Sequence, residues 1–428
     1  MNPLAIELND ILKGTTVFEL LSDFGKRFFF PKGIVTQSAE AKQKAHRFNA
    51  TVGMATLGPD PLYMKTMKEW LPSLTAGEIF PYAPTPGVPA LRELWKEEIY
   101  AKNPAAAGKN ISLPLVTTGL THGISTIADM FFDKGDKIVI PDMFWGNYRL
   151  IFEGRCEAEI VSFPFFSEEG GINMAGLESA LRAQSPEKTA LILNFPNNPT
   201  GYSPSVSEVE QITALLVKLA EEGRKLLVIS DDAYFGLFFE EDTCTESVFG
   251  FLADAHENIL AVKVDGATKE ELAWGFRVGF ITYGGKGLTD EHYTALLKKT
   301  GGAVRANISN SSKLGQSLIY NILKDPSHKA QKDESVKLMK VRYLKVREAL
   351  AKYSPDCILK PLPFNSGYFM TFIVEGKSSE ALRLFLLEEY GIGTISIQDK
   401  YLRVAYSSVD EDDIAPLYEL LEEAAEKL

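Results

Sequence analysis

The segment TALILNFPNNPTG, residues 189–201, is an apolar run that ends abruptly in a cluster of Asn, Pro and Gly. The apolar run predicts a buried strand. The cluster predicts a tight turn, since these three residue types are the usual turn formers. A second interpretation is that the turn holds one fixed side chain at the carboxyl end of a sheet. The neighbouring segments distinguish a plain turn from a turn that holds a functional side chain.

On both sides of this segment, from about residue 110 to 285, short apolar runs alternate with helical patterns. Helices are expected between several of the runs, for example over 205–223, where Ser207 and Glu210 have capping-box spacing. Such alternation predicts an α/β fold with a mostly parallel seven-stranded sheet that is covered on both faces. The expected strands are 113–118, 137–141, 158–165, 189–195, 225–232, 259–266 and 277–284.

The pattern changes after about residue 286. A long helical stretch over roughly 313–353 leads to a mixture of short strands and helices that includes GYFMTFIV, GTISI and YLRVAYSS. We expect a smaller α+β domain here, joined by part of the N-terminus. The predicted division is a large domain over 55–320 and a small domain formed by 1–54 and 321–428.

Composition excludes several classes of protein. The 428 residues carry a net charge of −12, which argues against nucleic acid as a partner. The three cysteines are far apart and the five histidines are scattered, so neither a disulfide framework nor a metal site is expected. No run approaches the roughly 18 apolar residues of a membrane span, and we expect a cytoplasmic protein without membrane contact.

Chemically useful side chains follow the expected strands. In an open α/β sheet, ligands bind beyond the carboxyl ends of the strands, so these side chains are expected to share one crevice. Each has an ordinary explanation when taken alone: a helix cap, a core aromatic residue, a strand-end charge or, for Lys269 beside Glu270 and Glu271, a solvated turn. The candidates are Thr121, Trp145, Asn198, Asp231, Tyr234, Lys269 and Arg277.

Taken together, these residues supply an amine, a carboxylate, a phenol, an amide, a guanidinium and a helix N-terminus. Pyridoxal phosphate requires this set of groups. An amine bonds to its aldehyde, and a carboxylate keeps its ring nitrogen protonated. A phenol and an amide bind its phenolic oxygen, while arginine and free N–H groups hold its phosphate.

The motifs NNPTG, DDAY and ATK-x7-R occur in that order, with the lysine and the arginine at 269 and 277. From about Asn49 to Ser408 the sequence resembles the class I/II aminotransferases of the fold type I pyridoxal phosphate enzymes, and within them an aspartate aminotransferase. The resemblance implies a transferase of amino-acid metabolism that moves an amino group from an L-amino acid to a 2-oxo acid, with aspartate or glutamate favoured.

The resemblance assigns the reactive chemistry to four residues. Lys269 matches the lysine that bonds to the cofactor and moves the proton during the reaction. Asp231 matches the partner of the ring nitrogen, and Tyr234 and Asn198 match the partners of the phenolic oxygen. On this interpretation the turn in NFPNNPTG exists to aim Asn198.

The remaining cofactor contacts follow in the same way. Arg277 and the backbone of Gly119, Leu120 and Thr121 match the family's phosphate cradle. Trp145 matches the aromatic residue that stacks on the cofactor ring.

Substrate recognition and assembly are also implied by the resemblance. Arg403 matches the arginine that binds the α-carboxylate; the alternative is a charged strand residue at a domain edge. Gly53 falls where the family lines the substrate. Tyr82 and Ser309 match residues contributed across a homodimer with shared active sites. Arg305 lies four residues before Ser309, where dicarboxylate-specific members carry an arginine; the alternative is a loop charge.

The sequence departs from the family pattern at two positions. Gly266 stands where a serine often binds the phosphate. Tyr148 stands where the aspartate-specific branch has a histidine, a change expected to alter the orientation of Asp231. Lys263 is an alternative covalent lysine, but it lies inside a strand pattern and lacks the spacing to Arg277.

Other functions stay open at this stage. An aromatic or kynurenine-type aminotransferase, or a C–S β-lyase, would share every cofactor residue. A cofactor-binding regulatory protein would need an added basic domain that the sequence does not show. A nucleotide-dependent oxidoreductase would need GxGxxG after the first strand, which GLTHG does not supply.

Overall fold

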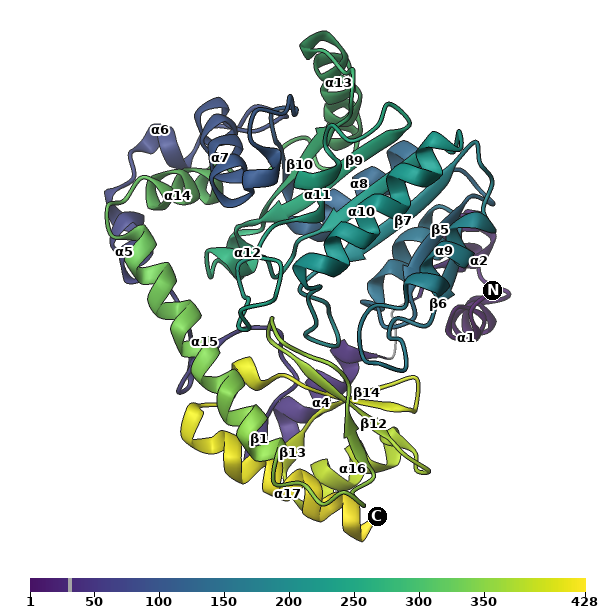
Figure 1. The fold of residues 1–428 in the computed structure, drawn as a ribbon, viewed down its shortest axis with the longest axis vertical. Helices are drawn as coiled ribbons and strands as arrows, with labels where there is room; N and C mark the ends of the chain where they lie inside the picture. The colour runs from purple at the N-terminus through teal and green to yellow at the C-terminus, as the bar shows by residue number, and fades with distance from the viewer. Residues whose placement is uncertain (30–32) are drawn as a thin grey trace.

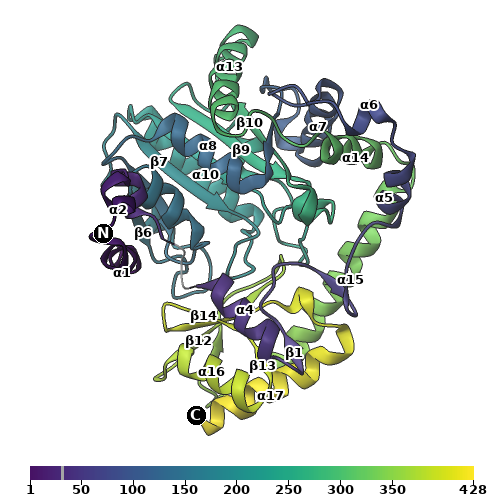
Figure 2. The same ribbon diagram turned by 180° about the vertical axis from the view of Figure 1, so that it is seen from behind.

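The computed structural model describes residues 1–29 and 33–428 (Figures 1 and 2). All seven expected strands are present in one sheet, in the order β4-β10-β9-β8-β7-β5-β6. Strand β10 is antiparallel to both neighbours, while β9–β8, β8–β7, β7–β5 and β5–β6 are parallel. The predicted mostly parallel sheet is therefore confirmed. Its strands are β4 (Leu115–Thr118), β5 (Lys137–Pro141), β6 (Glu159–Phe163), β7 (Thr189–Asn194), β8 (Leu226–Asp231), β9 (Ile259–Gly266) and β10 (Val278–Gly284).

The sheet is covered on both faces. Successive residues of a strand point to opposite faces, so Ile138 and Ile140 enter one core and Val139 enters the other. Helix α8 (Gly119–Phe131) packs in the first core, and α10 (Val206–Glu221) and α7 (Pro89–Lys102) pack in the second. Figure 1 shows α10 in front of the sheet and α8 behind it. Two buried faces explain why the strands read as continuous apolar runs.

The start of α10 corrects one prediction. The capping box is formed by Ser205 and Glu208: Ser205 Oγ accepts from the Glu208 N–H at 3.2 Å, and a Glu208 oxygen accepts from the Ser205 N–H at 2.8 Å. The expected pair, Ser207 and Glu210, has the same spacing but lies inside the helix. Glu208 is fixed by a further contact, because it accepts from the Ile172 N–H at 2.6 Å.

A second, antiparallel sheet lies in the C-terminal part of the chain. Its order is β11 (Leu359–Pro361), β12 (Met370–Val374), β15 (Tyr401–Val404), β14 (Ile395–Ile397). Helices α16 (Ser379–Glu389), α17 (Ile414–Lys427) and α4 (Ile34–Lys44) surround it (Figure 2). The N-terminal strand β1 (Phe48–Asn49) pairs with β13 (Ile392–Gly393), so the N-terminal segment joins this α+β unit as expected.

The expected helical stretch over 313–353 is present as two helices. The chain forms α14 (Lys313–Leu323) and α15 (His328–Leu350) with a break between them. Pro326 lies in the break and has no N–H to continue a helix. Helix α15 then runs from beside α14 to beside α17, from one sheet to the other (Figure 1).

The N-terminal helices lie elsewhere. Helices α1 (Pro3–Leu12), α2 (Thr16–Leu20) and α3 (Asp23–Arg27) lie beside β6, with an Arg27–Glu157 ion pair at 3.2 Å (Figure 2). The domain boundaries after residues 54 and 320 stay a prediction. Within residues 1–29 and 33–428, no helix is long and apolar enough to cross a membrane.

The remaining elements are short, apart from α9 and α13. They are β2 (Thr56–Leu57), β3 (Asp60–Pro61), α5 (Lys65–Trp70), η1 (Leu71–Ser73), α6 (Ala76–Ile79), η2 (Pro104–Ala106), η3 (Arg149–Arg155), α9 (Met174–Arg182), α11 (Val248–Leu252), α12 (Ala267–Glu270), η4 (Trp274–Phe276), α13 (Asp290–Asn307), η5 (Tyr406–Ser408) and η6 (Glu411–Asp413).

Candidate active site

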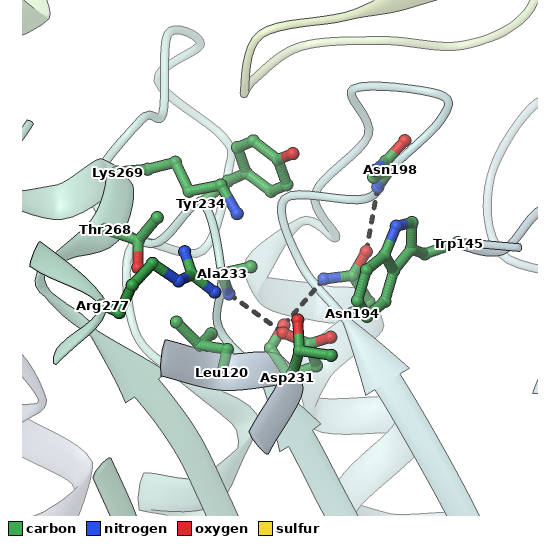
Figure 3. Close-up of a pocket in the computed structure, with 11 residues that line it drawn as sticks. Leu120, Trp145, Asn194, Asn198, Asp231, Ala233, Tyr234, Thr268, Lys269 and Arg277 are labelled. Carbon is green, nitrogen blue, oxygen red and sulfur yellow. Dashed lines mark hydrogen bonds between the residues drawn. The ribbon is translucent and has the colours of Figure 1, made fainter. Parts of the chain in front are cut away.

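A pocket of about 100 Å³ lies at the carboxyl ends of β7, β8 and β9 (Figure 3). This is the position at which open α/β sheets bind ligands. The pocket brings together eight of the residues expected from the sequence. Its lining is Leu120, Thr121, Trp145, Asn194, Asn198, Asp231, Ala233, Tyr234, Thr268, Lys269 and Arg277.

Lys269 lies on the short helix α12, which directly follows β9. Its amine is 4.5 Å from the centre of the Tyr234 ring. Burial disfavours the ammonium form and lowers the pKa of Lys269 to about 8, with Asp231 opposing this shift and Arg277 adding to it. A neutral amine is a nucleophile and a base, so Lys269 is prepared for both tasks near neutral pH.

We expect reductive methylation of Lys269 in the cofactor-free protein to rise with pH and reach half its maximal rate near pH 8. The lowered pKa exposes the reactive neutral amine at lower pH than in an ordinary lysine, whose pKa is about 10.4. Peptide mass spectrometry at a series of pH values measures this, with surface lysines of the same sample as the reference. A midpoint near pH 10 would contradict the account.

Asp231 is the last residue of β8 and is buried. One of its carboxylate oxygens accepts from the Tyr148 hydroxyl at 2.5 Å, and the other accepts from the Ala233 N–H at 3.2 Å. Burial raises the pKa of Asp231 to about 6, although the Tyr148 hydrogen bond and the charge of Lys269 oppose the rise. Tyr148, noted from the sequence as a departure, therefore contacts Asp231 directly.

The turn of the opening segment is built by asparagine side chains. Asn194 donates to the Asp231 carbonyl at 2.8 Å and accepts from the Asn198 N–H at 2.9 Å (Figure 3). Asn197 accepts from the Thr200 N–H at 3.1 Å. The turn thus fixes Asn198 in the pocket, and both interpretations of the segment are correct. Sequence reasoning missed Asn194; the available signal was a polar residue that closes an otherwise apolar strand.

Arg403, on β15, is buried and approaches the pocket from the C-terminal sheet. It donates to Asn198 Oδ1 and to the Thr51 carbonyl, both at 2.9 Å, and its guanidinium is 4.3 Å from the centre of the Phe369 ring. Among the described residues its Nε has no hydrogen-bond partner. Burial lowers the pKa of Arg403 to about 10. A buried guanidinium with an unsatisfied donor is suited to bind an anion.

A second anion-binding arrangement lies where α8 begins. Gly119 has φ 75° and lies against Arg277: a Cβ at this position would be only 2.5 Å from an Arg277 nitrogen. The N–H groups of Leu120 and Thr121 belong to the first turn of α8, where helices bind anions. Thr268, which sequence reasoning missed, also lines this pocket.

Three residues that the sequence assigned to a neighbouring subunit's site do not line the pocket of the single chain: Tyr82, Ser309 and Arg305. Tyr82 is 90% exposed. Arg305 is exposed near the end of α13 and donates to Ser309 Oγ at 2.8 Å. Gly53 does lie close to the site, because a Cβ there would be 3.4 Å from the Tyr234 hydroxyl.

The alternative lysine lies outside the pocket. Lys263 is buried in ion pairs with Asp232 and with Asp265, the latter at 3.4 Å. No cluster of three or more potential metal ligands occurs in residues 1–29 and 33–428. The cysteines of these residues, Cys156, Cys244 and Cys357, are all unpaired.

Comparison with known proteins places the chain in a family. The model of the aminotransferase class I and II family matches residues 49–421. A probable aspartate/prephenate aminotransferase of Aquifex aeolicus is 25% identical over 396 residues, covering 89% of this chain and 93% of the relative. The aspartate/prephenate aminotransferase of Thermus thermophilus is 28% identical over 252 residues, covering 58% of this chain and 60% of that one.

Solved structures agree on the fold. An aminotransferase from Anaerococcus prevotii superposes with a TM-score of 0.83 at 22% identity, covering 95% of this chain and 99% of that one. The kynurenine aminotransferase of Pyrococcus horikoshii superposes with a TM-score of 0.79 at 17% identity, covering 96% of this chain and 98% of that one. The chain therefore belongs to the class I and II aminotransferases, pyridoxal phosphate-dependent enzymes that transfer an amino group between an amino acid and a 2-oxo acid.

Proposed function

We propose that this enzyme transfers the amino group of L-aspartate or L-glutamate to a 2-oxo acid, with Lys269 as its catalytic residue. The observation that carries the proposal is that a lysine of lowered pKa lines the pocket, while a buried arginine with a spare donor, Arg403, is hydrogen-bonded to Asn198 of the same pocket. The first can hold and move a proton; the second can bind an α-carboxylate.

The donor set fits pyridoxal phosphate. The absence of a Cβ at Gly119 lets the Arg277 guanidinium lie against the start of α8, so that this cation and the first-turn N–H groups would together bind the phosphate. Asp231 would hold the ring nitrogen, and Tyr234 and Asn198 the phenolic oxygen. Trp145 would cover one face of the ring. Gly266 offers no side chain to the phosphate, so the cradle depends on Arg277 and backbone N–H groups.

When bound, the cofactor supplies an aldehyde and an electron-accepting ring. Lys269 would hold the cofactor through its amine, and as a neutral amine it would take the proton from the substrate Cα and deliver it on the cofactor side. Arg403 would bind the substrate α-carboxylate. Asp231, kept ionised against its burial by Tyr148 and Lys269, holds the ring-nitrogen proton in place.

Aspartate as the substrate is supported by the names of the relatives from Aquifex and Thermus and by the position of Arg305. The test is the visible absorbance of the purified protein before and after excess L-aspartate, without any oxo acid. Conversion of the cofactor band into the amine form supports the proposal. A band that does not change with aspartate would remove aspartate as substrate.

We also propose a homodimer with shared active sites. Tyr82, Ser309 and Arg305 are exposed or half-buried in the single chain, as contributors to a neighbouring subunit's site would be. A folded monomer with full activity at high dilution would contradict it. A cytoplasmic location stays a prediction from the sequence.

Replacing Arg305 with Leu is expected to lower kcat/KM for aspartate about 100-fold and to leave alanine and phenylalanine nearly unchanged. The reason is that a charged arginine pairing with the side-chain carboxylate contributes a few kcal/mol, and neutral side chains do not use it. Steady-state kinetics on the three substrates measures this. Unchanged kinetics with aspartate would show that Arg305 is only a loop charge.

Replacing Tyr148 with Phe is expected to raise the pKa of Asp231 by about one unit, because the hydroxyl hydrogen bond favours its ionised form. Asp231 must be ionised, so the acid limb of the kcat–pH profile should move to higher pH by that amount. Tyr283→Phe, which removes a buried hydroxyl bound to Thr300, is the matched control. An unmoved acid limb would contradict the role of Tyr148.

An aromatic or kynurenine-type aminotransferase is the second candidate. The observation in its favour is a cleft of about 770 Å³ that shares Trp145 and Asn198 with the pocket and whose lining includes Phe144, Ile34 and Ile397. A cleft of this size could hold a large apolar side chain. Turnover of phenylalanine or kynurenine above that of aspartate would favour it. A C–S β-lyase would instead release ammonia and pyruvate without an oxo acid.

A further inference from the structure

Two glutamates follow Lys269 directly, and both are buried. Glu270 is 7% exposed and Glu271 is 0% exposed. The structure therefore excludes the solvated turn that the sequence left open for this segment. Since buried carboxylates are costly unless they are paired, their partners define what this segment is attached to.

The partners come from two other helices. One Glu270 oxygen accepts from Lys102 of α7 at 2.7 Å and from Lys332 of α15 at 2.8 Å. Glu271 accepts from Lys332 at 3.1 Å, and its other oxygen lies 2.6 Å from His328 Nε2, also on α15. We call these five residues the charge cluster.

The cations of the charge cluster keep its two glutamates ionised despite their burial. Burial alone would raise the pKa of Glu270, but Lys102 and Lys332 outweigh burial and lower it. In the same way, Lys332 and His328 outweigh burial at Glu271 and lower its pKa. Both carboxylates are therefore ionised, and the segment that carries Lys269 is tied at two successive residues.

Helix α15 links this segment to the other sheet. Its 23 residues span about 35 Å. His328 and Lys332 lie in its first two turns. Further along, the buried Arg342 donates to the Ser407 carbonyl at 2.5 Å and to the Thr56 carbonyl at 2.6 Å. The far half of the helix packs against α17 beside the C-terminal sheet (Figure 1).

Lys269 also faces α15 itself. A second, small cavity of about 20 Å³ is lined by Lys269 and Lys332 together with Ser335, Val336 and Met339 of α15. Lys269 therefore lies between this cavity and the cofactor pocket. A shift of α15 would reach Lys269 both through the charge cluster and through this packing.

We propose that the charge cluster positions Lys269, fixing its backbone to α7 and α15 and coupling the reactive amine to the placement of the C-terminal sheet. Lys332, which bridges both glutamates, is the central positioning residue. The proposal rests on Lys269 being the covalent lysine, but its test uses the cofactor-loaded enzyme without substrate, so failure to transaminate aspartate does not affect it.

The experiment compares Lys332→Met with the wild type by two measurements. The first is hydrogen–deuterium exchange of the amides of residues 266–273. The second is the pH midpoint of the visible cofactor band, which reports protonation of the link to Lys269. We expect amide exchange at least tenfold faster, because the segment loses its tie to α15. We expect the pH midpoint of the band to move by about half a unit, because Lys269 then shifts relative to Asp231 and Arg277, the charges that act on its pKa.

Two variants separate positioning from general stability. Lys337→Met, an exposed lysine on the same helix, should change neither measurement. Lys332→Arg should retain both wild-type values because it keeps the charge and the donors. A folded Lys332→Met with wild-type exchange and midpoint would overturn the proposal, even if its melting temperature fell.

Should Lys332→Met fail to fold, His328→Ala removes only the contact between His328 and Glu271. The same two measurements then apply, with a smaller expected change in the same exchange segment. Unchanged exchange and an unchanged midpoint in this variant would also overturn the proposal.

Discussion

Replacing Lys269 with Ala should lower kcat for transamination by about 10⁴-fold or more. The variant loses both the covalent attachment of the cofactor and the group that transfers the proton at Cα. General acid–base catalysis alone contributes about 10²–10⁴-fold. The measurement is single-turnover conversion of added pyridoxal phosphate with a large excess of amino acid.

The control for this variant is Lys337→Ala, which changes an exposed lysine far from the pocket and should retain wild-type turnover. The Lys269→Ala protein should stay folded, because the change removes a poorly solvated amine whose pKa burial has already lowered. Retention of more than a tenth of the wild-type rate would show that another residue carries the proton.

Replacing Arg403 with Ala should lower kcat/KM for amino acids by about 10²–10³-fold. Removing one partner of a buried, hydrogen-bonded charge pair costs about 2–5 kcal/mol, and Arg403 is a buried cation that is hydrogen-bonded to Asn198 of the pocket. Arg403→Lys should recover only part of the loss, because a lysine lacks the two parallel donors of the guanidinium.

The loss in the Arg403 variants should depend on the substrate. A primary amine without a carboxylate should react with the variant and the wild type at similar rates, and cofactor affinity should not change. Steady-state kinetics and a cofactor titration measure the two effects. Equal losses with and without the carboxylate would mean that Arg403 supports the fold through Asn198 and Thr51 and does not bind the substrate.

Much of this architecture could be predicted because the sequence patterns have direct physical causes. Runs such as TALILN and ILAVKVDG are apolar over several consecutive residues, as a strand buried on both faces requires. The strand ends then bring Asp231, Asn198 and Lys269 to one edge of the sheet, whatever the details of the loops.

The errors arose where local signals have two equivalent solutions. Ser205–Glu208 and Ser207–Glu210 share one spacing, and contacts of Glu208 outside the helix, with the Ile172 N–H and the Tyr202 hydroxyl, favour the first pair as the cap of α10. The break before α15 depends on Pro326, which a helical pattern on both sides concealed.

Long-range contacts account for what the sequence could not predict. Nothing local shows that Asn194 bonds to the Asp231 carbonyl, because the two residues meet only across neighbouring strands. The burial of Glu270 and Glu271 likewise depends on helices α7 and α15, which are distant in the sequence. The roles of Tyr82, Ser309 and Arg305 require a neighbouring subunit and stay predictions.

Borohydride reduction of the cofactor-loaded protein, followed by peptide mass spectrometry, identifies the lysine that is bonded to pyridoxal phosphate. We expect one modified site, Lys269. We expect no modification when an amino acid has first converted the cofactor into its amine form. Modification of Lys263 or of another lysine in place of Lys269 would contradict the assignment to Lys269.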